Sequence, residues 1–304
     1  MAGTSTQSPR YDFEPIIHRQ PVRFPKGERL AVLLYVNIEH VPFGSTSPAH
    51  AIYPGTLQFS PDILNHAWRD YGNRVGLWRI MDAMDKHGFR GTVNLNSDVC
   101  REYPVIIKEG SSRRWDWGAQ GDNNTSIPTF MKEDQERSFI QQNLKIIEDA
   151  TGTRPRGWLS MCLAESFVTP DLLAEAGVEY VSNYAHDELP VPMRVKRGRD
   201  GVLLTMPYTL EINDVPTIMV KGSSAETFGR MIRDQFDVLY EEGRTRPRIM
   251  TISVHPFISG HPFRMKHIEP ALQYVASHHD VWLTTGVEIN DWYRANYLRP
   301  TRGD

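Results

Sequence analysis

Glu39 and His40 stand together at the end of an apolar run, and this pair is where the sequence first suggests chemistry. The run from Ala31 to His40 reads A-V-L-L-Y-V-N-I-E-H. It is too short for a buried helix and predicts a β-strand that is covered on both faces. A carboxylate at such a strand end is desolvated and becomes more basic, so we expect Glu39 to act as a general base toward water. The plain alternative is a carboxylate paired with an arginine.

His255 follows a second apolar run, Arg248 to Val254, and begins the segment H-P-F-I-S-G-H-P. An imidazole at this place would protonate a leaving group as a general acid. Residue type alone is equally consistent with a structural histidine. Cys162 is interpreted as a small buried residue rather than a nucleophile, because no signature of a reactive cysteine surrounds it.

Polar residues follow other expected strands as well. One such residue is usually a helix cap or a loop hydrogen bond, whereas several together favour a site at one mouth of a sheet. The tryptophans Trp117 and Trp158 would line a pocket for a flat ring or would simply fill the core. The polar set comprises Asn96, Asp98, Gln120, Asn124, Glu165, Asn183, Asp187, Glu211 and Asp214.

The elements that must position these residues alternate between strand and helix. Because this alternation repeats seven or eight times, it predicts a mainly parallel sheet closed as a barrel, in one domain over residues 27–304. Residues 1–26 are expected to form an extended N-terminal arm, and the long connection after His40 is typical of a lid or binding loop. A hairpin is expected to turn at Asp200-Gly201, with its basic residues solvated. The expected strands are 31–40, 89–95, 156–161, 178–182, 248–254 and 281–284, with short ones before 120 and 211. The expected helices are 73–87, 104–109, 132–150, 169–177, 225–242 and a last one to about 297.

The composition favours a small-molecule substrate. The net charge of -3 over 304 residues provides no basic field for nucleic acid or an anionic membrane. The two cysteines are too few for a disulfide framework, and no apolar run reaches the length of a membrane span or resembles an export signal. We therefore expect a cytoplasmic protein, and a homo-oligomer without nucleic-acid or membrane partners.

Four motifs resemble the polysaccharide deacetylase (NodB homology) superfamily and, within it, the allantoinase-like branch that includes cyclic imide hydrolases. They are V-N-I-E-H at the first strand, R-P-R-G-W-L-S around Gly157, V-E-Y-V-S-N-Y-A-H-D-E-L-P, and S-V-H-P-F-I-S-G-H-P-F-R. The resemblance spans about residues 27 to 297. It implies an α/β fold of the NodB-like kind, an irregular (β/α) barrel with seven or eight mainly parallel strands, and hydrolysis of a non-peptide C–N bond.

The resemblance also implies a site. The first motif of the family's deacetylases holds a base and a metal ligand, matched here by Glu39 and His40, and the terminal family histidine is matched by His255. The family's other ligands are two histidines four residues apart, and that spacing falls here on Gln120 and Asn124. Amide oxygens are weak ligands for zinc. Either a carboxylate such as Asp98 or Asp122 completes a weakly held divalent site (Zn or Mn) with His40, or no metal is required.

The resulting hypothesis is ring opening of a cyclic imide or ureide. Glu39 would activate water, His255 would protonate the departing nitrogen, and the amides of Gln120 and Asn124 would stabilise the oxyanion. Trp117, Trp158 and Glu165 would contact the substrate. One alternative is a metal-dependent carbohydrate N-deacetylase, and a second is a barrel that has lost catalysis and only binds a ligand.

Overall fold

The computed structural model describes residues 8–45, 61–198 and 200–298. Most of the lid or binding loop predicted after His40 lies outside these residues. None of the helices in the described part combines the length and apolarity needed to cross a membrane.

The described strands form one curled, mainly parallel sheet, and its spatial order is β6-β7-β5-β4-β3-β2-β1-β8. The long strand β1 is central: β9 pairs with its first four residues and β2 with its last five, while β8 runs along its other side. The sheet is a half-barrel whose two end strands are β6 and β8, and an isolated parallel bridge joins Asn213, in the segment after β7, to Ser253 of β8. This confirms the predicted irregular barrel. The strands are β1 Leu30–Ile38, β2 Gly91–Leu95, β3 Asp116–Ala119, β4 Gly157–Trp158, β5 Tyr180–Val181, β6 Val191–Arg194, β7 Val202–Thr205, β8 Arg248–Val254 and β9 Val281–Thr284.

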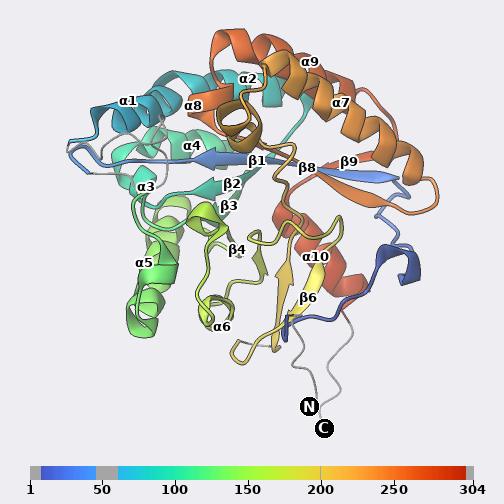
Figure 1. The fold of residues 1–304 in the computed structure, drawn as a ribbon, viewed down its shortest axis with the longest axis horizontal. Coiled ribbons are helices and arrows are strands. Elements are labelled where there is room, and N and C mark those ends of the chain that lie inside the picture. Colours follow the sequence, from blue (N-terminus) through green and yellow to red (C-terminus); the bar gives the residue numbers. More distant parts are fainter. Residues whose placement is uncertain (1–7, 46–60, 199, 299–304) are drawn as a thin grey trace.

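Helices cover the outside of the sheet, with α2, α7 and α9 on one side of β1 and α5 and α6 on the other (Figure 1). Their ends follow local chemistry: the Ser224 hydroxyl accepts from the backbone N–H of Thr227 at the start of α7, and Gly152 ends α5 with a positive φ of 74°. The helices are α1 Ile63–Tyr71, α2 Leu77–His87, α3 Asp98–Glu102, α4 Pro104–Ser112, α5 Glu133–Thr151, α6 Thr169–Glu175, α7 Ala225–Glu242, α8 Pro256–Ser259, α9 Pro262–Ala276 and α10 Gly286–Asn296. Shorter helical turns are Ile16–His18, Gly72–Gly76, Pro128–Phe130, Met161–Leu163 and Val215–Val220.

Side chains of β1 alternate between two cores. Leu30, Val32, Leu34, Val36 and Ile38 pack outward in the core that the helices cover. Ala31, Leu33 and Tyr35 belong to the core inside the barrel. Because successive side chains of a strand point to opposite faces, this alternation decides which residues reach the barrel interior.

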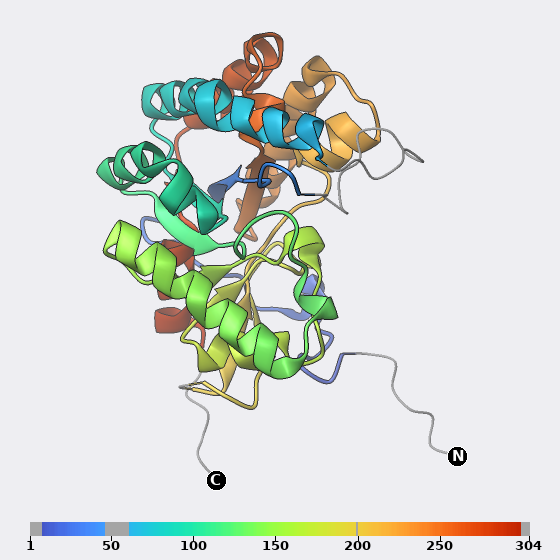
Figure 2. The same cartoon turned by 90° about the vertical axis from the view of Figure 1, so that its left-hand side faces the viewer.

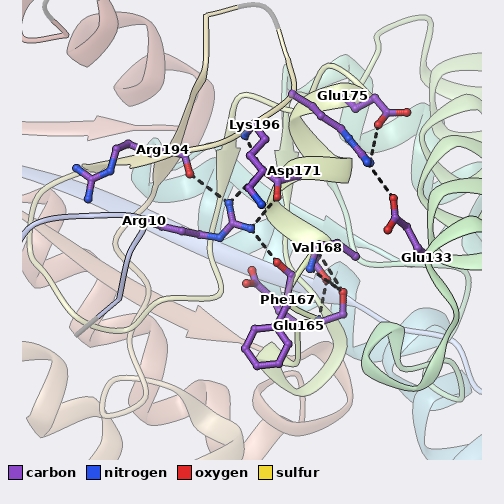
Figure 3. A network of polar contacts seen from close by, with 12 residues as sticks. Arg10, Glu133, Glu165, Phe167, Val168, Asp171, Glu175, Arg194 and Lys196 are labelled. Carbon is purple, nitrogen blue, oxygen red and sulfur yellow. Dashed lines mark hydrogen bonds and ion pairs between the residues drawn. The ribbon is translucent and has the colours of Figure 1, made fainter. Parts of the chain in front are cut away.

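The N-terminal arm lies along the barrel of its own chain from residue 8 onward. The guanidinium of Arg10 donates to both carboxylate oxygens of Asp171 in α6, at 3.1 and 2.8 Å, and to the backbone oxygens of Phe167 and Arg194 (Figure 3). Arg19 pairs with Asp187 at 2.6 Å, and Phe24 is buried against Trp292. Charge pairs and an aromatic anchor therefore hold the arm in place.

Candidate active site

Glu39 and His255 meet at the carboxyl ends of β1 and β8. Glu39 Oε1 lies 3.6 Å from His255 Nε2, and both side chains are almost fully buried. β1 points toward the side of the molecule that faces the viewer in Figure 2. The structure thus brings together a carboxylate and an imidazole that are more than two hundred residues apart in the chain.

Strand alternation explains why Glu39, and not its neighbour His40, reaches this place. Glu39 continues the inward series of Ala31, Leu33 and Tyr35, and Asn37 also faces inward, where its amide donates to Ser253 Oγ. His40 falls on the other side of the chain. Its ring lies in a separate cavity of about 360 Å³, edge-on to the ring of Tyr103. Burial lowers the pKa of His40.

Two further groups hold the Glu39 carboxylate. Arg69 of α1 is only 1% exposed, and its Nε lies 3.5 Å from Glu39 Oε2. The Gln120 Nε2 donates to Glu39 Oε1 at 3.3 Å. Asn73 fixes the main chain, because its amide donates to the backbone oxygen of Glu39 at 2.9 Å. The carboxylate is therefore oriented on both oxygens, and the arginine pairing considered as an alternative coexists with the contact to His255.

Asp214 orients His255. The Asp214 carboxylate accepts from His255 Nδ1 at 2.6 Å and from the His255 backbone N–H at 2.7 Å. Ser259 Oγ donates to the same carboxylate at 2.6 Å. Burial by itself lowers the pKa of His255, but the charge and hydrogen bond of Asp214, together with Glu39, outweigh it, so the pKa is raised above the usual 6.5. A raised pKa keeps the imidazole protonated, as a general acid requires.

The raised pKa of His255 predicts how kcat/KM should change on the alkaline limb of the pH–rate profile. Protonated His255 persists above pH 6.5 and is lost as the pH rises through its raised pKa, so kcat/KM should fall on that limb. Asp214→Asn removes the main group that raises the pKa, and we expect the limb to move to lower pH. Ser259→Ala leaves the charge of Asp214 in place and should shift the limb less. Equal profiles for wild type and Asp214→Asn would contradict the assignment of His255 as the acid.

The two amides at the family's ligand positions are both buried. Asn124 is fully buried, and its backbone N–H donates to the backbone oxygen of His40. The Nε2 of Gln120 donates to Glu39. The side-chain oxygen of Gln120, an acceptor, is therefore the end of the amide that does not contact the carboxylate. This arrangement differs from the donor role expected for Gln120 toward an oxyanion, whereas the role of Asn124 stays a prediction.

The donor set does not fit a zinc centre. The matched ligand positions carry amides, and the ring of His40 lies away from Glu39. Asp98 accepts from Asn123 Nδ2 at 2.8 Å and faces Arg101 at 3.5 Å. Within residues 8–45, 61–198 and 200–298, no group of three His, Cys, Asp or Glu side chains is arranged to hold a metal ion. His40 and Asp98 as metal ligands stay a prediction that the geometry does not favour.

The predicted substrate contacts lie elsewhere in the structure. Trp117 and Trp158 are buried in the outer core, and their indole N–H groups donate to Ser111 Oγ and Ser160 Oγ. On β3, Trp117 pairs with the outward-facing Val93, so parity turns it away from the barrel interior. Both carboxylate oxygens of Glu165 are engaged, by Asn183 Nδ2 at 2.6 Å and by the Tyr184 hydroxyl at 2.7 Å. Cys162, interpreted as buried, is exposed in the irregular turn Met161–Leu163.

Arg69 is the site residue that the sequence analysis missed, and Asp214 was noticed only as one polar residue among many. Arg69 lies in α1, a helix that was not predicted because the segment after His40 is rich in turn-forming residues. Asp214 lies beyond β7 in a segment without a regular strand. The helical spacing of the apolar residues Leu64, Ala67, Trp68 and Tyr71 was the available signal for α1, but nothing local marks Arg69 as the partner of Glu39.

The chain is similar in sequence and in fold to known proteins. No protein-family model matches the chain. A protein of Schizosaccharomyces pombe whose name assigns it provisionally to the polysaccharide deacetylases is 27% identical over 245 residues, covering 75% of each chain. The crystal structure of a probable polysaccharide deacetylase from Pseudomonas aeruginosa PAO1 is 26% identical with a TM-score of 0.80, covering 90% of this chain and 94% of that one. An allantoinase structure has a TM-score of 0.81 at 24% identity, covering 94% of this chain and 99% of that one, and supports the fold alone.

These similarities bear on the predicted resemblance and on the predicted activity. The resemblance to the polysaccharide deacetylase superfamily, with its NodB-like barrel, is confirmed. The prediction of a hydrolase that acts on carbon–nitrogen bonds is confirmed for that broad class of reaction. The fold of the deacetylase-named structure and that of the allantoinase match this chain almost equally well, so similarity does not choose between their reactions.

Proposed function

We propose that this protein hydrolyses an amide bond in a cyclic imide or ureide, with Glu39 as the base and His255 as the acid. One observation carries the proposal: Glu39 lies 3.6 Å from His255 in a buried site whose matched ligand positions are the amides of Gln120 and Asn124. A ring imide suits such a site, because its nitrogen leaves as a delocalised amide and needs less electrophilic help than a sugar acetamide.

The mechanism uses the chain's own side chains. Glu39 takes a proton from water as the water oxygen attacks the ring carbonyl, and the carbonyl oxygen becomes an oxyanion. When the C–N bond breaks, protonated His255 gives its proton to the departing nitrogen. The proton on Glu39 then passes to His255 across their short separation, which restores both groups. Asp214 keeps the imidazole oriented throughout.

A substrate panel tests the proposal. The wild-type protein is assayed with allantoin, hydantoin, dihydrouracil and succinimide, each with and without a chelator. We expect ring opening of at least one compound, with a rate that the chelator changes less than about twofold, because every step is assigned to side chains. Turnover that depends on added zinc or manganese would contradict this mechanism.

A metal-dependent carbohydrate N-deacetylase is the second candidate, and the names of the relatives from Schizosaccharomyces pombe and Pseudomonas aeruginosa favour it. It predicts release of acetate from N-acetylglucosamine oligomers and inhibition by chelator. Binding without turnover of any compound would instead favour a ligand-binding barrel.

A further inference from the structure

Gln120 carries a buried acceptor that has no hydrogen-bond partner in the described part of the chain. The side chain is only 5% exposed, and its Oε1 has no hydrogen-bond partner among the described residues. Buried polar atoms are nearly always paired, because an unpaired one has lost its hydrogen bonds to water. The exception here lies in the same amide group that contacts Glu39, so it belongs to the candidate active site.

The orientation of this amide follows from its neighbour. An ionised carboxylate can only accept hydrogen bonds, so the NH₂ group of Gln120 must be the end that faces Glu39. Gln120 Oε1 is therefore the end of the amide that does not contact Glu39. The backbone of Gln120 is also held on both sides: its N–H donates to Leu95 O at 2.8 Å, and its oxygen accepts from Asn96 Nδ2 at 3.1 Å. The acceptor is therefore preorganised.

We infer that Gln120 Oε1 accepts a hydrogen bond from a ring N–H of the substrate, next to the carbonyl that water attacks. The inference rests on the proposed function and narrows its substrate class to imides and ureides whose ring nitrogen carries hydrogen. The position is suitable, because the Gln120 amide lies 3.3 Å from the Glu39 oxygen and the nitrogen of an imide is one bond from its reacting carbon. Gln120 thus becomes a specificity-determining residue where the related deacetylases are expected to hold metal.

Substrates that differ at one atom isolate this contact. The kcat/KM values of succinimide and N-methylsuccinimide are measured for the wild type, Gln120→Met and Gln120→Leu, two apolar replacements of similar volume. The wild type should prefer succinimide by about 10- to 100-fold, because the methylated ring leaves the buried acceptor unpaired. Both variants should lose most of this preference. Loss of the donor to Glu39 also slows the variants, but it slows both substrates equally and cancels in the ratio.

Asn73→Leu is the matched control. It removes another buried amide, one that donates to the backbone of Glu39, and should lower both rates while keeping the wild-type ratio. Variants of Gln120 that open the rings with the wild-type ratio would overturn this inference and leave the proposed function standing. A wild type that opens neither ring nor any other compound of the panel would overturn both. Circular dichroism confirms that each variant is folded before its ratio is compared.

Discussion

Glu39→Gln is expected to lower kcat by at least about 100-fold, and by up to about 10⁴-fold, for whichever ring substrate the wild type opens. The amide has nearly the shape of the carboxylate but cannot take a proton from water. Gln120 and Arg69 hold the Glu39 carboxylate in one orientation. We therefore expect no other group to take over its role as base in the variant. Steady-state kinetics and calorimetric binding of the same substrate provide the measurement.

Binding distinguishes a lost base from a damaged site. Substrate affinity should change far less than kcat, because Glu39 acts on water rather than on the substrate. Glu39→Asp provides a control that keeps the charge but withdraws it, and it should retain more activity than Glu39→Gln. Full turnover by Glu39→Gln would remove Glu39 from the role of base.

Arg69→Met is expected to lower the free energy of unfolding by about 3–5 kcal/mol. Both partners of the pair are almost completely buried, so the variant leaves the Glu39 carboxylate without its guanidinium in a site shielded from water. The guanidinium also lies 4.2 Å from the ring centre of Phe257, and this cation–π contact is lost as well. Urea denaturation of the wild type and the variant measures the difference.

A double-mutant cycle separates the charge from the packing. Glu39→Gln combined with Arg69→Met removes both charges, and the double variant should be more stable than the sum of the two single losses predicts. Strict additivity would mean that the pair contributes nothing to stability and that Arg69 acts through Phe257 and Asn65 alone.

Local patterns were sufficient for much of the fold. The strands Arg248–Val254 and Val281–Thr284 and the helix Ala225–Glu242 have the predicted bounds, because apolar periodicity and flanking turn residues mark them clearly. Short strands such as β4 and β5 were predicted too long, since their ends depend on neighbouring strands. Helices α1 and α9 were missed: the first follows a stretch rich in turn formers, and the second begins at Pro262 and contains Pro270.

The sequence by itself determined that Glu39 and His255 end two buried strands. Because side chains alternate between the two faces of a strand, it could also have placed His40, Trp117 and Trp158 on the outer face. It did not determine which distant groups surround Glu39 and His255. Arg69 and Asp214 reach the site from α1 and from the segment after β7, and their contacts arise only when the sheet curls and brings these segments to one rim. Local periodicity specifies the face on which a side chain lies, whereas ion pairs between distant segments depend on the path of the whole chain.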